Sequence, residues 1–289
     1  MTRFEFMKIH ADKFSIVEMA KILGVTPSGY YDYCRRAPSQ HVLDDIVLLK
    51  DIKAIFTLSR ETYGRYRIYL ELRRAGKACS QRRVSRLMRE DNLVAKARRR
   101  FKITTKANSD AITVSNKLAQ DFKADKPNEK FVSDITYIWT AAGWLYLAVV
   151  MDLFSRKIVG MAMGERITKE LVCRAFMQAM LHRSYPNNFL YHSDRGSQYT
   201  SSELQKLVKM YLGNSSMSGK GNCYDNAAME SFFHTLKLEC TDDVNFDTRE
   251  EAMNNIFDYV QIFYNNQRIH SHLGYLSPNA FEKLHEARK

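Results

Sequence analysis

Three carboxylates, Asp134, Asp194 and Glu230, have the residue types and surroundings that could support chemistry. Asp134 falls in an aromatic and β-branched run that reads as a strand, and Asp194 ends a second apolar run, "NFLYHS". If these strands are neighbours in one sheet, two like charges meet near its edge, which calls for a cation or a raised pKa. Oxygen ligands that leave room for water and phosphate suit magnesium or manganese.

Glu230 lies in a predicted helix that begins near Asp225 and Asn226. Seven residues at about 100° each fall ~20° short of two turns, so Glu230 and Lys237 share one stripe of this helix. The stripe combines a metal ligand with a cation able to hold a DNA phosphate. Each feature alone also has an ordinary interpretation, as a turn residue or a solvated face. The prediction therefore depends on the combination.

The loop after Asp194, "HSDRGSQY", contains Gly196 two residues beyond the carboxylate. Glycine permits a tight turn, and loops that follow strands commonly carry binding residues. We therefore expect Ser197, Gln198 and Tyr199 to lie near a ligand.

The elements that must position these residues read as an α/β domain. Three strands joined by short turns are expected at 131–139, 143–154 and 156–163. After them the pattern predicts a helix at 168–183, a strand at 188–193, a helix at 201–212, a strand at 214–218 and a helix at 225–240. In such an order carboxylates at strand ends can converge.

The front of the chain reads as helical. Residues 14–23 and 27–36 form two short helices with helix-turn-helix punctuation, because Gly24 ends the first, Thr26 can cap the second and Pro27 occupies its first turn.

A second helical unit starts near Asp44, and Ser80 can cap its last helix. On that helix Arg82, Arg86 and Arg89 form one stripe beside an apolar stripe. This basic stripe is either a solvated helix face or a surface presented to DNA phosphates or a major groove.

Charge distribution favours the DNA interpretation. The formal net charge is +12, yet residues 1–127 hold 27 Lys and Arg against 14 Asp and Glu, so all the excess positive charge lies there. Residues 96–130 have little apolar periodicity and many charges, as expected of a connecting segment that tracks a nucleic-acid backbone.

Other features concern location. Five widely spaced cysteines without a C-x-x-C pair predict neither a disulfide framework nor a structural zinc site, which indicates a reducing cytosol. No signal-peptide core is present at the amino terminus, and the longest apolar run, Trp144 to Met151, is too short to span a bilayer. We expect a cytoplasmic, nucleoid-associated protein.

Several motifs resemble one known family. "VSDITYIW", "HSDRGSQYT", "SMSGKGNCYDNAAMESFFHTLKLE" and "YNNQRIHSHLGYLSPNAF" are similar to the DDE transposases of bacterial insertion sequences, of the OrfB type that shares the retroviral integrase core. "ILGVTPSGYYDY", "YGRYRIYLELRRAG" and "RRVSRLMRE" resemble the helix-turn-helix segments ahead of that core. The 35 residues between Asp194 and Glu230 match the family's spacing.

The resemblance implies an RNase H-like, integrase-type core with a mixed five-stranded sheet, preceded by all-α helix-turn-helix units. It implies that Asp134, Asp194 and Glu230 hold two Mg²⁺ or Mn²⁺ ions and that Lys237 contacts the terminal DNA. Ser133 stands where the family commonly has Thr. Further expected DNA contacts are the arginines of the basic stripe together with Arg195, Gln198, Lys220, Asn226 and Arg268.

The implied reaction is metal-dependent cleavage at transposon ends followed by strand transfer. A catalytically silent DNA-binding regulator and an RNase H-like nuclease remain as alternatives. Expected partners are double-stranded DNA, further copies of the chain and an OrfA or OrfA–OrfB fusion partner. His270 and His272 are expected to be structural or DNA-contacting rather than metal ligands. The expected domains are 1–40, 41–95, a basic linker at 96–127, and the core with its C-terminal extension at 128–289.

Overall fold

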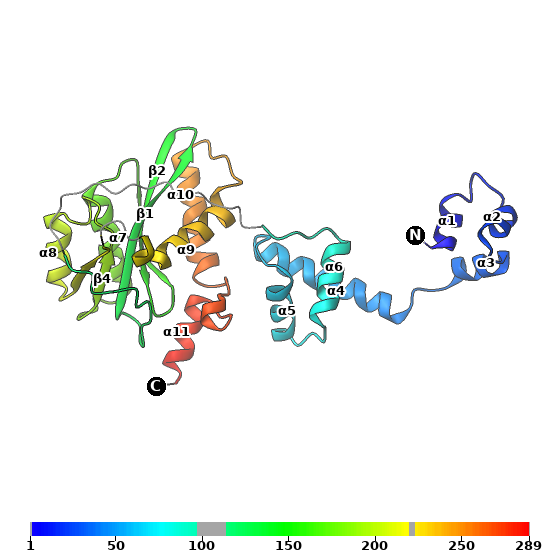
Figure 1. Cartoon of the computed structure of the whole chain (residues 1–289), viewed down its shortest axis with the longest axis horizontal. Helices are drawn as coiled ribbons and strands as arrows, with labels where there is room; N and C mark the ends of the chain where they lie inside the picture. The colour runs from blue at the N-terminus through cyan, green and yellow to red at the C-terminus, as the bar shows by residue number, and fades with distance from the viewer. Residues whose placement is uncertain (1, 97–113, 220–222, 289) are drawn as a thin grey trace. The chain divides into compact units, whose positions relative to one another are not determined.

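The computed structural model describes residues 2–96, 114–219 and 223–288. The chain divides into two compact units, Met1–Ala54 and Ile55–Lys289, and each is described by itself. Figure 1 labels helices α1 to α11 and strands β1, β2 and β4. In the described part of the chain, no helix has the length and apolar character needed to cross a membrane.

The first unit is helical, with α1 (Arg3–Ile9), α2 (Ile16–Leu23), α3 (Pro27–Arg35) and the start of α4 (Gln40–Leu58). The predicted punctuation is confirmed. Gly24 ends α2 in the left-handed conformation, and the Thr26 side chain accepts a hydrogen bond from the Gly29 amide at 3.1 Å at the start of α3. The helices pack around a small core of Met7, Met19, Ala20 and Tyr30. Helix α1, which supplies Met7, was not predicted.

The second unit begins with the end of α4, followed by α5 (Arg65–Arg74) and α6 (Gln81–Glu90). The predicted cap of α6 is confirmed, because the Ser80 hydroxyl accepts a hydrogen bond from the Arg83 amide at 3.2 Å. Val84, Leu87 and Met88 are the buried face of α6.

The remainder of this unit is built on one mixed five-stranded sheet. Its strands are β1 (Lys130–Thr140), β2 (Gly143–Asp152), β3 (Ile158–Gly164), β4 (Leu190–Ser193) and β5 (Asn214–Met217), in the order β3-β2-β1-β4-β5. The first three strands form the predicted antiparallel meander, while β4 pairs parallel to β1 and β5 parallel to β4. The predicted α/β order is therefore confirmed.

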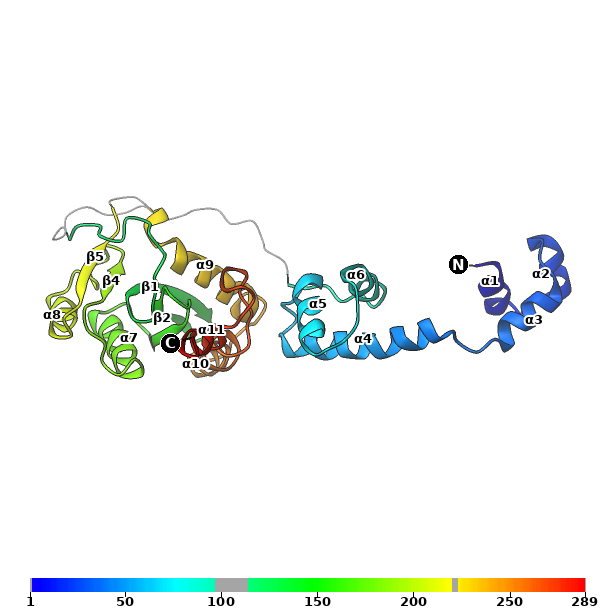
Figure 2. The same cartoon turned by 90° about the horizontal axis from the view of Figure 1, so that it is seen from below.

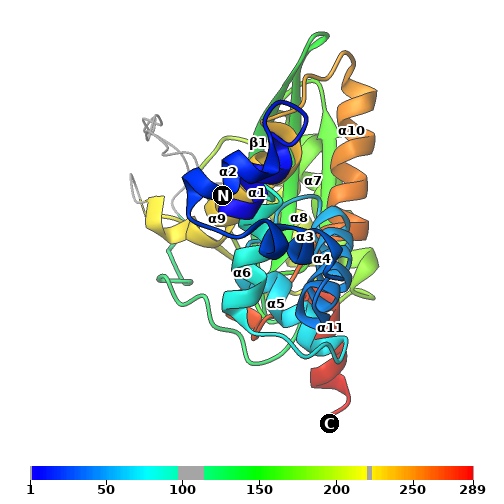
Figure 3. The same ribbon diagram turned by 90° about the vertical axis from the view of Figure 1, so that its right-hand side faces the viewer.

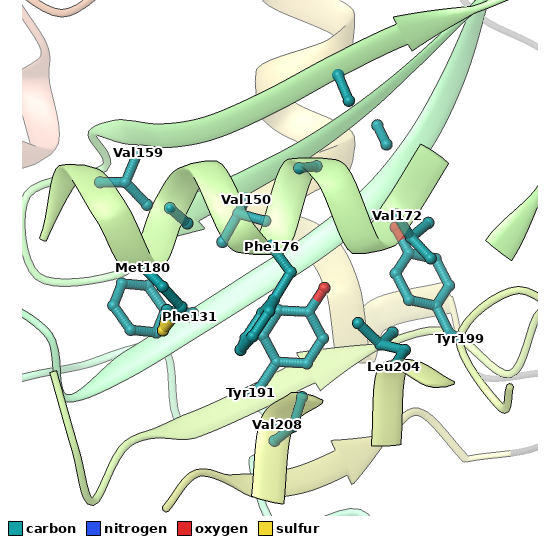
Figure 4. Close-up of a cluster of buried hydrophobic side chains, with 14 of the residues drawn as sticks. Phe131, Val150, Val159, Val172, Phe176, Met180, Tyr191, Tyr199, Leu204 and Val208 are labelled. Carbon is teal, nitrogen blue, oxygen red and sulfur yellow. The ribbon is translucent and has the colours of Figure 1, made fainter. Parts of the chain in front are cut away.

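Helices cover both faces of the sheet. Figure 2 shows β1 and β2 between α7 (Lys169–His182) and α9 (Ala227–Leu236). On β2, Ala148 and Val150 belong to the core under α7, while the alternate residues, which point to the opposite face, are also buried. The core on the α7 side also takes in α8 (Ser202–Met210) and is shown in Figure 4.

One contact between sheet and helix is unusually close. A Cβ atom on Gly160 of β3 would lie 2.1 Å from the carbonyl oxygen of Ala175 in α7. Only glycine allows this approach of strand and helix backbones.

The C-terminal part completes the domain. A 3₁₀ turn (Cys223–Asn226) precedes α9, and a π-helical turn (Lys237–Thr241) follows it. Helix α10 (Arg249–Asp258) contacts β1 and β2, and Figure 3 shows it running beside the strands. It continues into a second π-helical turn (Tyr259–Tyr264).

Helix α11 (Pro278–Glu286) closes the chain after a 3₁₀ turn at Ser271–Leu273. It is tied to the sheet by buried charges, because Arg183 pairs with Asp152 at 2.9 Å and with Glu282 at 2.5 Å. The C-terminal segment is therefore packed as part of the core of the sheet domain.

Candidate active site

Strand pairing brings two of the predicted carboxylates together. Strand β4 pairs parallel to β1 with Val132 opposite His192, so two residues further along each chain lead to Asp134 and Asp194 at the same level. Neighbouring strands lie about 4.8 Å apart, which puts the two carboxylates side by side. The sequence expectation that these two strands are neighbours is confirmed by the sheet order.

Asp134 lies on the side of β1 that faces α9. The preceding Ser133 side chain points the other way, since its hydroxyl donates to the Val149 carbonyl at 2.8 Å and lies 3.0 Å from the Tyr199 hydroxyl. Burial raises the pKa of Asp134 to about 8, and the charges of Asp194 and Glu230 add to the rise, while the Ile135 amide, at 2.8 Å, opposes it.

Asp194 is held by the turn that follows β4. Its Oδ1 accepts a hydrogen bond from the Gly196 amide at 3.0 Å, and burial raises its pKa. A Cβ on Gly196 would lie 2.4 Å from Gln198 Nε2 and 3.1 Å from Asp194 Oδ1, so glycine is required for the tight turn predicted here.

Glu230 approaches from α9. It lies in the first turn of that helix, is exposed, and has its pKa raised by partial burial. Met229, Phe232 and Phe233 are buried and hold the helix on the domain. Its charge acts on Asp134, as noted above, so the three predicted carboxylates share one neighbourhood.

Carboxylate oxygens are suitable ligands for a divalent cation, although the three carboxylates do not form a complete coordination site. Across residues 2–96, 114–219 and 223–288, no three His, Cys, Asp or Glu side chains form a group able to hold a metal ion. Two largely buried aspartates side by side nevertheless repel each other when ionised, and a hard cation with oxygen ligands relieves that repulsion. Asp134 and Asp194 are thus the residues that would hold such an ion, with Glu230 nearby.

Asp225 is a buried carboxylate that the sequence reasoning did not assign. It accepts hydrogen bonds from Asn116 Nδ2 at 2.8 Å, Gln120 Nε2 at 3.1 Å and the Gly219 amide at 2.7 Å. These bonds join the segment before β1 and the strand β5 end to the start of α9. The acceptor role could have been suspected only from the position of Asp225 ahead of a helix.

Asn226, predicted as a DNA contact, is instead a buried residue of the site. It is 6% exposed, and its Nδ2 donates to the Ser133 carbonyl at 3.3 Å. Its Oδ1 is buried and has no hydrogen-bond partner among the described residues. The side chain therefore braces β1 beside Asp134 and is not presented to solvent.

Arg268, also predicted to contact DNA, is buried and paired within the domain. It is 7% exposed, and its guanidinium donates to both carboxylate oxygens of Glu239, at 2.7 and 2.6 Å. The Tyr259 hydroxyl donates to the same carboxylate at 2.7 Å. Tyr199, which was expected near a ligand, is fully buried in the core under α7.

The other predicted contacts have various surroundings. Lys237 places its ammonium over the Tyr137 ring, 4.8 Å from the centroid. Arg195 donates to the Ser218 carbonyl at 2.7 Å, and Gln198 is partly buried beside Ser197. Lys220 lies outside the described residues.

The basic stripe of α6 is only partly open. Arg82 and Arg89 are exposed, whereas Arg86 pairs with Glu90 at 3.0 Å. Exposed arginines on a helix face remain suitable for phosphate contacts.

The sequence comparisons put the chain in the class of nucleic-acid transferases with an integrase-type core. Residues 124–223 and 230–285 match the Integrase core domain, and residues 43–101 match the HTH-like domain. The chain belongs to the family of DNA transposases of insertion sequences to which InsF of insertion sequence IS3 belongs.

Two relatives cover nearly the whole chain. The chain is 43% identical to a 31 kDa protein of insertion element IS600 from Shigella sonnei, over 93% of this chain and 99% of that protein. It is 41% identical to transposase InsF for insertion sequence IS3A from Escherichia coli K12, over 97% and 98%.

Two solved structures with a similar chain trace come from retroviruses. The HTLV-2 integrase catalytic core domain in complex with magnesium covers 55% of this chain and 99% of its own, with a TM-score of 0.39 and 16% identity. A simian T-cell lymphotropic virus intasome in complex with the PP2A subunit B56 gamma covers 80% and 74%, with a TM-score of 0.43 and 13% identity.

Proposed function

We propose that this transposase cuts transposon ends and joins them to DNA through a metal-dependent centre formed by Asp134, Asp194 and Glu230. The observation that carries the proposal is the parallel register of β1 and β4, whose continuation leads to Asp134 on β1 and to Asp194 directly after the end of β4. Glu230 on α9 completes the set through its electrostatic effect on Asp134.

Two divalent ions held by these carboxylates would supply activation of the attacking oxygen and stabilisation of the leaving oxygen at phosphorus. The protein's own contribution is to hold the carboxylates rigidly. The Gly196 and Ile135 amides orient Asp194 and Asp134 by hydrogen bonds, and the buried residues of α9 fix the helix that carries Glu230. Attack by water gives a 3′-hydroxyl, and attack by that hydroxyl on a second phosphodiester gives strand transfer, with no covalent enzyme intermediate.

The test is a strand-transfer assay with purified protein, Mg²⁺ or Mn²⁺, and labelled DNA from the native element ends. Asp134→Asn, Asp194→Asn and Glu230→Gln keep side-chain volume and remove one negative charge each. We expect each variant to lose cleavage and joining while DNA binding persists. A control variant, Glu203→Gln, removes an exposed carboxylate on α8 that pairs with Lys169.

Each result has a clear meaning. Residual joining by one purified variant removes that residue from the ligand set. Nicking without joining by the wild-type protein favours the nuclease, and DNA binding without any metal-dependent product favours the regulator.

The finer assignments rest on the same proposal. Residues 1–40 and 41–95 are proposed as DNA-binding units and 96–127 as a basic linker, of which 97–113 lie outside the described residues. Residues 55–95 belong to the same compact unit as residues 128–289. Because two DNA ends must be brought together, we propose an assembly of at least two copies on DNA, joined by an OrfA protein or present as an OrfA–OrfB fusion. A mass measurement of the complex tests the copy number.

A further inference from the structure

One pocket of the domain, separate from Asp134, Asp194 and Glu230, is lined by more positively than negatively charged side chains. It has a volume of about 560 Å³ and is walled by α5, β2, α9 and the segment that leads into α11. Pockets of a few hundred Å³ accommodate small ligands or ligand fragments. The charged groups that line it, among the described residues, are Arg67, Lys96, Arg156, Glu239 and Arg268.

The only carboxylate in this wall is already used. Glu239 accepts hydrogen bonds from Nε and Nη2 of Arg268 at 2.7 and 2.6 Å, which leaves no acidic group of the described wall for the other cations. Within the described residues neither Arg67 nor Arg156 forms an ion pair or a hydrogen bond, and Arg67 rests on the Tyr63 ring at 5.5 Å. The pocket therefore holds more positive than negative charge.

Its groups are also partly removed from water. Burial lowers the pKa of Arg67, with the nearby Arg268 charge adding to the effect, and burial lowers the pKa of Arg156. The pKa of His270 lies well below its usual value because of burial and then because of these three arginines. Three guanidinium groups thus act on one imidazole.

His270 offers an unused polar atom at this place. Its ring packs edge-on against Tyr264, with centroids 4.8 Å apart, and its Nε2 is buried without a hydrogen-bond partner among the described residues. A buried polar atom without a partner costs free energy, and so do clustered like charges. An anion in the pocket would relieve the second cost, and one of its oxygens would relieve the first by accepting a hydrogen bond from His270 in the neutral tautomer that carries its proton on Nε2.

We propose that this pocket binds a backbone phosphate of the DNA substrate, as an anchor separate from the catalytic carboxylates. Arginine is suited to phosphate because its planar donors match the phosphate oxygens, and partial desolvation strengthens the contact. The choice of DNA as the source of the phosphate rests on the proposed function.

Helix α9 links the two sites. Ser231 lines the pocket and directly follows Glu230, so the two side chains point about 100° apart around the helix. A phosphate held in the pocket therefore fixes the DNA relative to the helix that carries the catalytic glutamate. This anchor differs from the predicted contacts of α6 and Lys237, which do not line the pocket.

The test measures binding without chemistry. The affinity of the full chain for a labelled duplex with the element's end is measured by fluorescence anisotropy in EDTA, over a range of salt concentrations. Arg156→Gln and Arg67→Gln should each weaken binding about tenfold and lower the slope of log K against log salt by roughly one unit, as expected for one lost phosphate contact. Arg156→Lys should keep the slope, because the charge remains.

Lys209→Gln is the matched control, since it removes an exposed cation on α8 that does not line the pocket. Wild-type slopes in both arginine variants would overturn the proposal, as would equal losses in Lys209→Gln. Thermal melting in inorganic phosphate distinguishes the source. Stabilisation by free phosphate that both variants lose, with an unchanged DNA slope, would assign the pocket to a free anion and overturn the DNA anchor.

Folding and chemistry are checked separately. Melting curves of the variants in plain buffer must match the wild type, and Arg156→Lys provides the second variant if Arg156→Gln unfolds. A wild-type protein that binds DNA but never joins it would refute the proposed function while leaving the slopes fully interpretable.

Discussion

The buried pair of Arg268 and Glu239 should control the stability of the catalytic domain. Both residues are 6–7% exposed, and two charge-assisted hydrogen bonds of 2.7 and 2.6 Å join them. Arg268→Met removes the cation and leaves the Glu239 carboxylate buried with only the Tyr259 hydroxyl as a donor at 2.7 Å. Breaking such a pair from one side costs about 3–5 kcal/mol of unfolding free energy.

Urea unfolding measures this loss. We expect a lower midpoint with an unchanged m-value, and a decrease in Tm of roughly 10 °C for a domain of this size. In the double variant Arg268→Met/Glu239→Gln the stranded charge is gone and Tyr259 keeps an acceptor. It should therefore recover at least about 2 kcal/mol relative to the single variant.

The control is the exposed pair of Arg249 and Glu165, with Nη1 and Oε1 3.2 Å apart and side chains 27% and 68% exposed. Arg249→Met should cost about 1 kcal/mol or less. The reasoning is refuted if Arg268→Met is as mild as the control, or if the double variant is no more stable than the single one.

Three further perturbations address the fold. Gly160→Ala should lower the unfolding free energy by more than about 3 kcal/mol in urea, because the new Cβ would meet the α7 backbone. Gly64→Ala is the control: its new Cβ would have no atom within 4 Å, so the unfolding free energy should change by about 1 kcal/mol at most. Thr26→Ala should lose about 1 kcal/mol from the first unit, while Ser15→Ala, at an N-cap without a side-chain hydrogen bond, should lose less; similar losses would contradict the capping argument. The pKa of His270 in the folded protein lies below its unfolded value of about 6.5, so the stability that the neutral ring provides is present above that pH and is lost as the pH falls below it, by up to about 1.4 kcal/mol per pH unit. The difference in unfolding free energy between the wild type and His270→Gln should fall with this slope. An unchanged difference between pH 7 and pH 5 would contradict the argument.

Local signals in the sequence predicted most elements of the sheet and the front helices. Gly24, Thr26 and Ser80 act within three residues of themselves, so their roles follow from residue type and position alone. The meander was also predictable, because short turns are local features. The placement of Asp134 in one strand and of Asp194 after another followed in the same way, and only the neighbourhood of β1 and β4 had to be assumed.

Burial partners distant in sequence were not predictable in this way. Arg268 reads as a surface cation in a polar stretch, and only the fold brings it to Glu239, 29 residues earlier. Asn226 likewise reads as a loop residue, yet its partner is the Ser133 carbonyl on another strand. Helices α10 and α11 were not predicted, although the buried residues of α10, Ala252 and Ile256, lie at helical spacing.

The order of strands also has a consequence for the nascent chain. The meander β1-β2-β3 closes through short turns, so it can form soon after residue 164 is synthesised, whereas β4 must return past α7 to reach the far side of β1. Asp194 therefore joins Asp134 only after a long loop closes, and Glu230 arrives later still. Under the proposed function, a growing chain completes its carboxylate centre only near the end of its synthesis, and a chain released before α9 lacks Glu230.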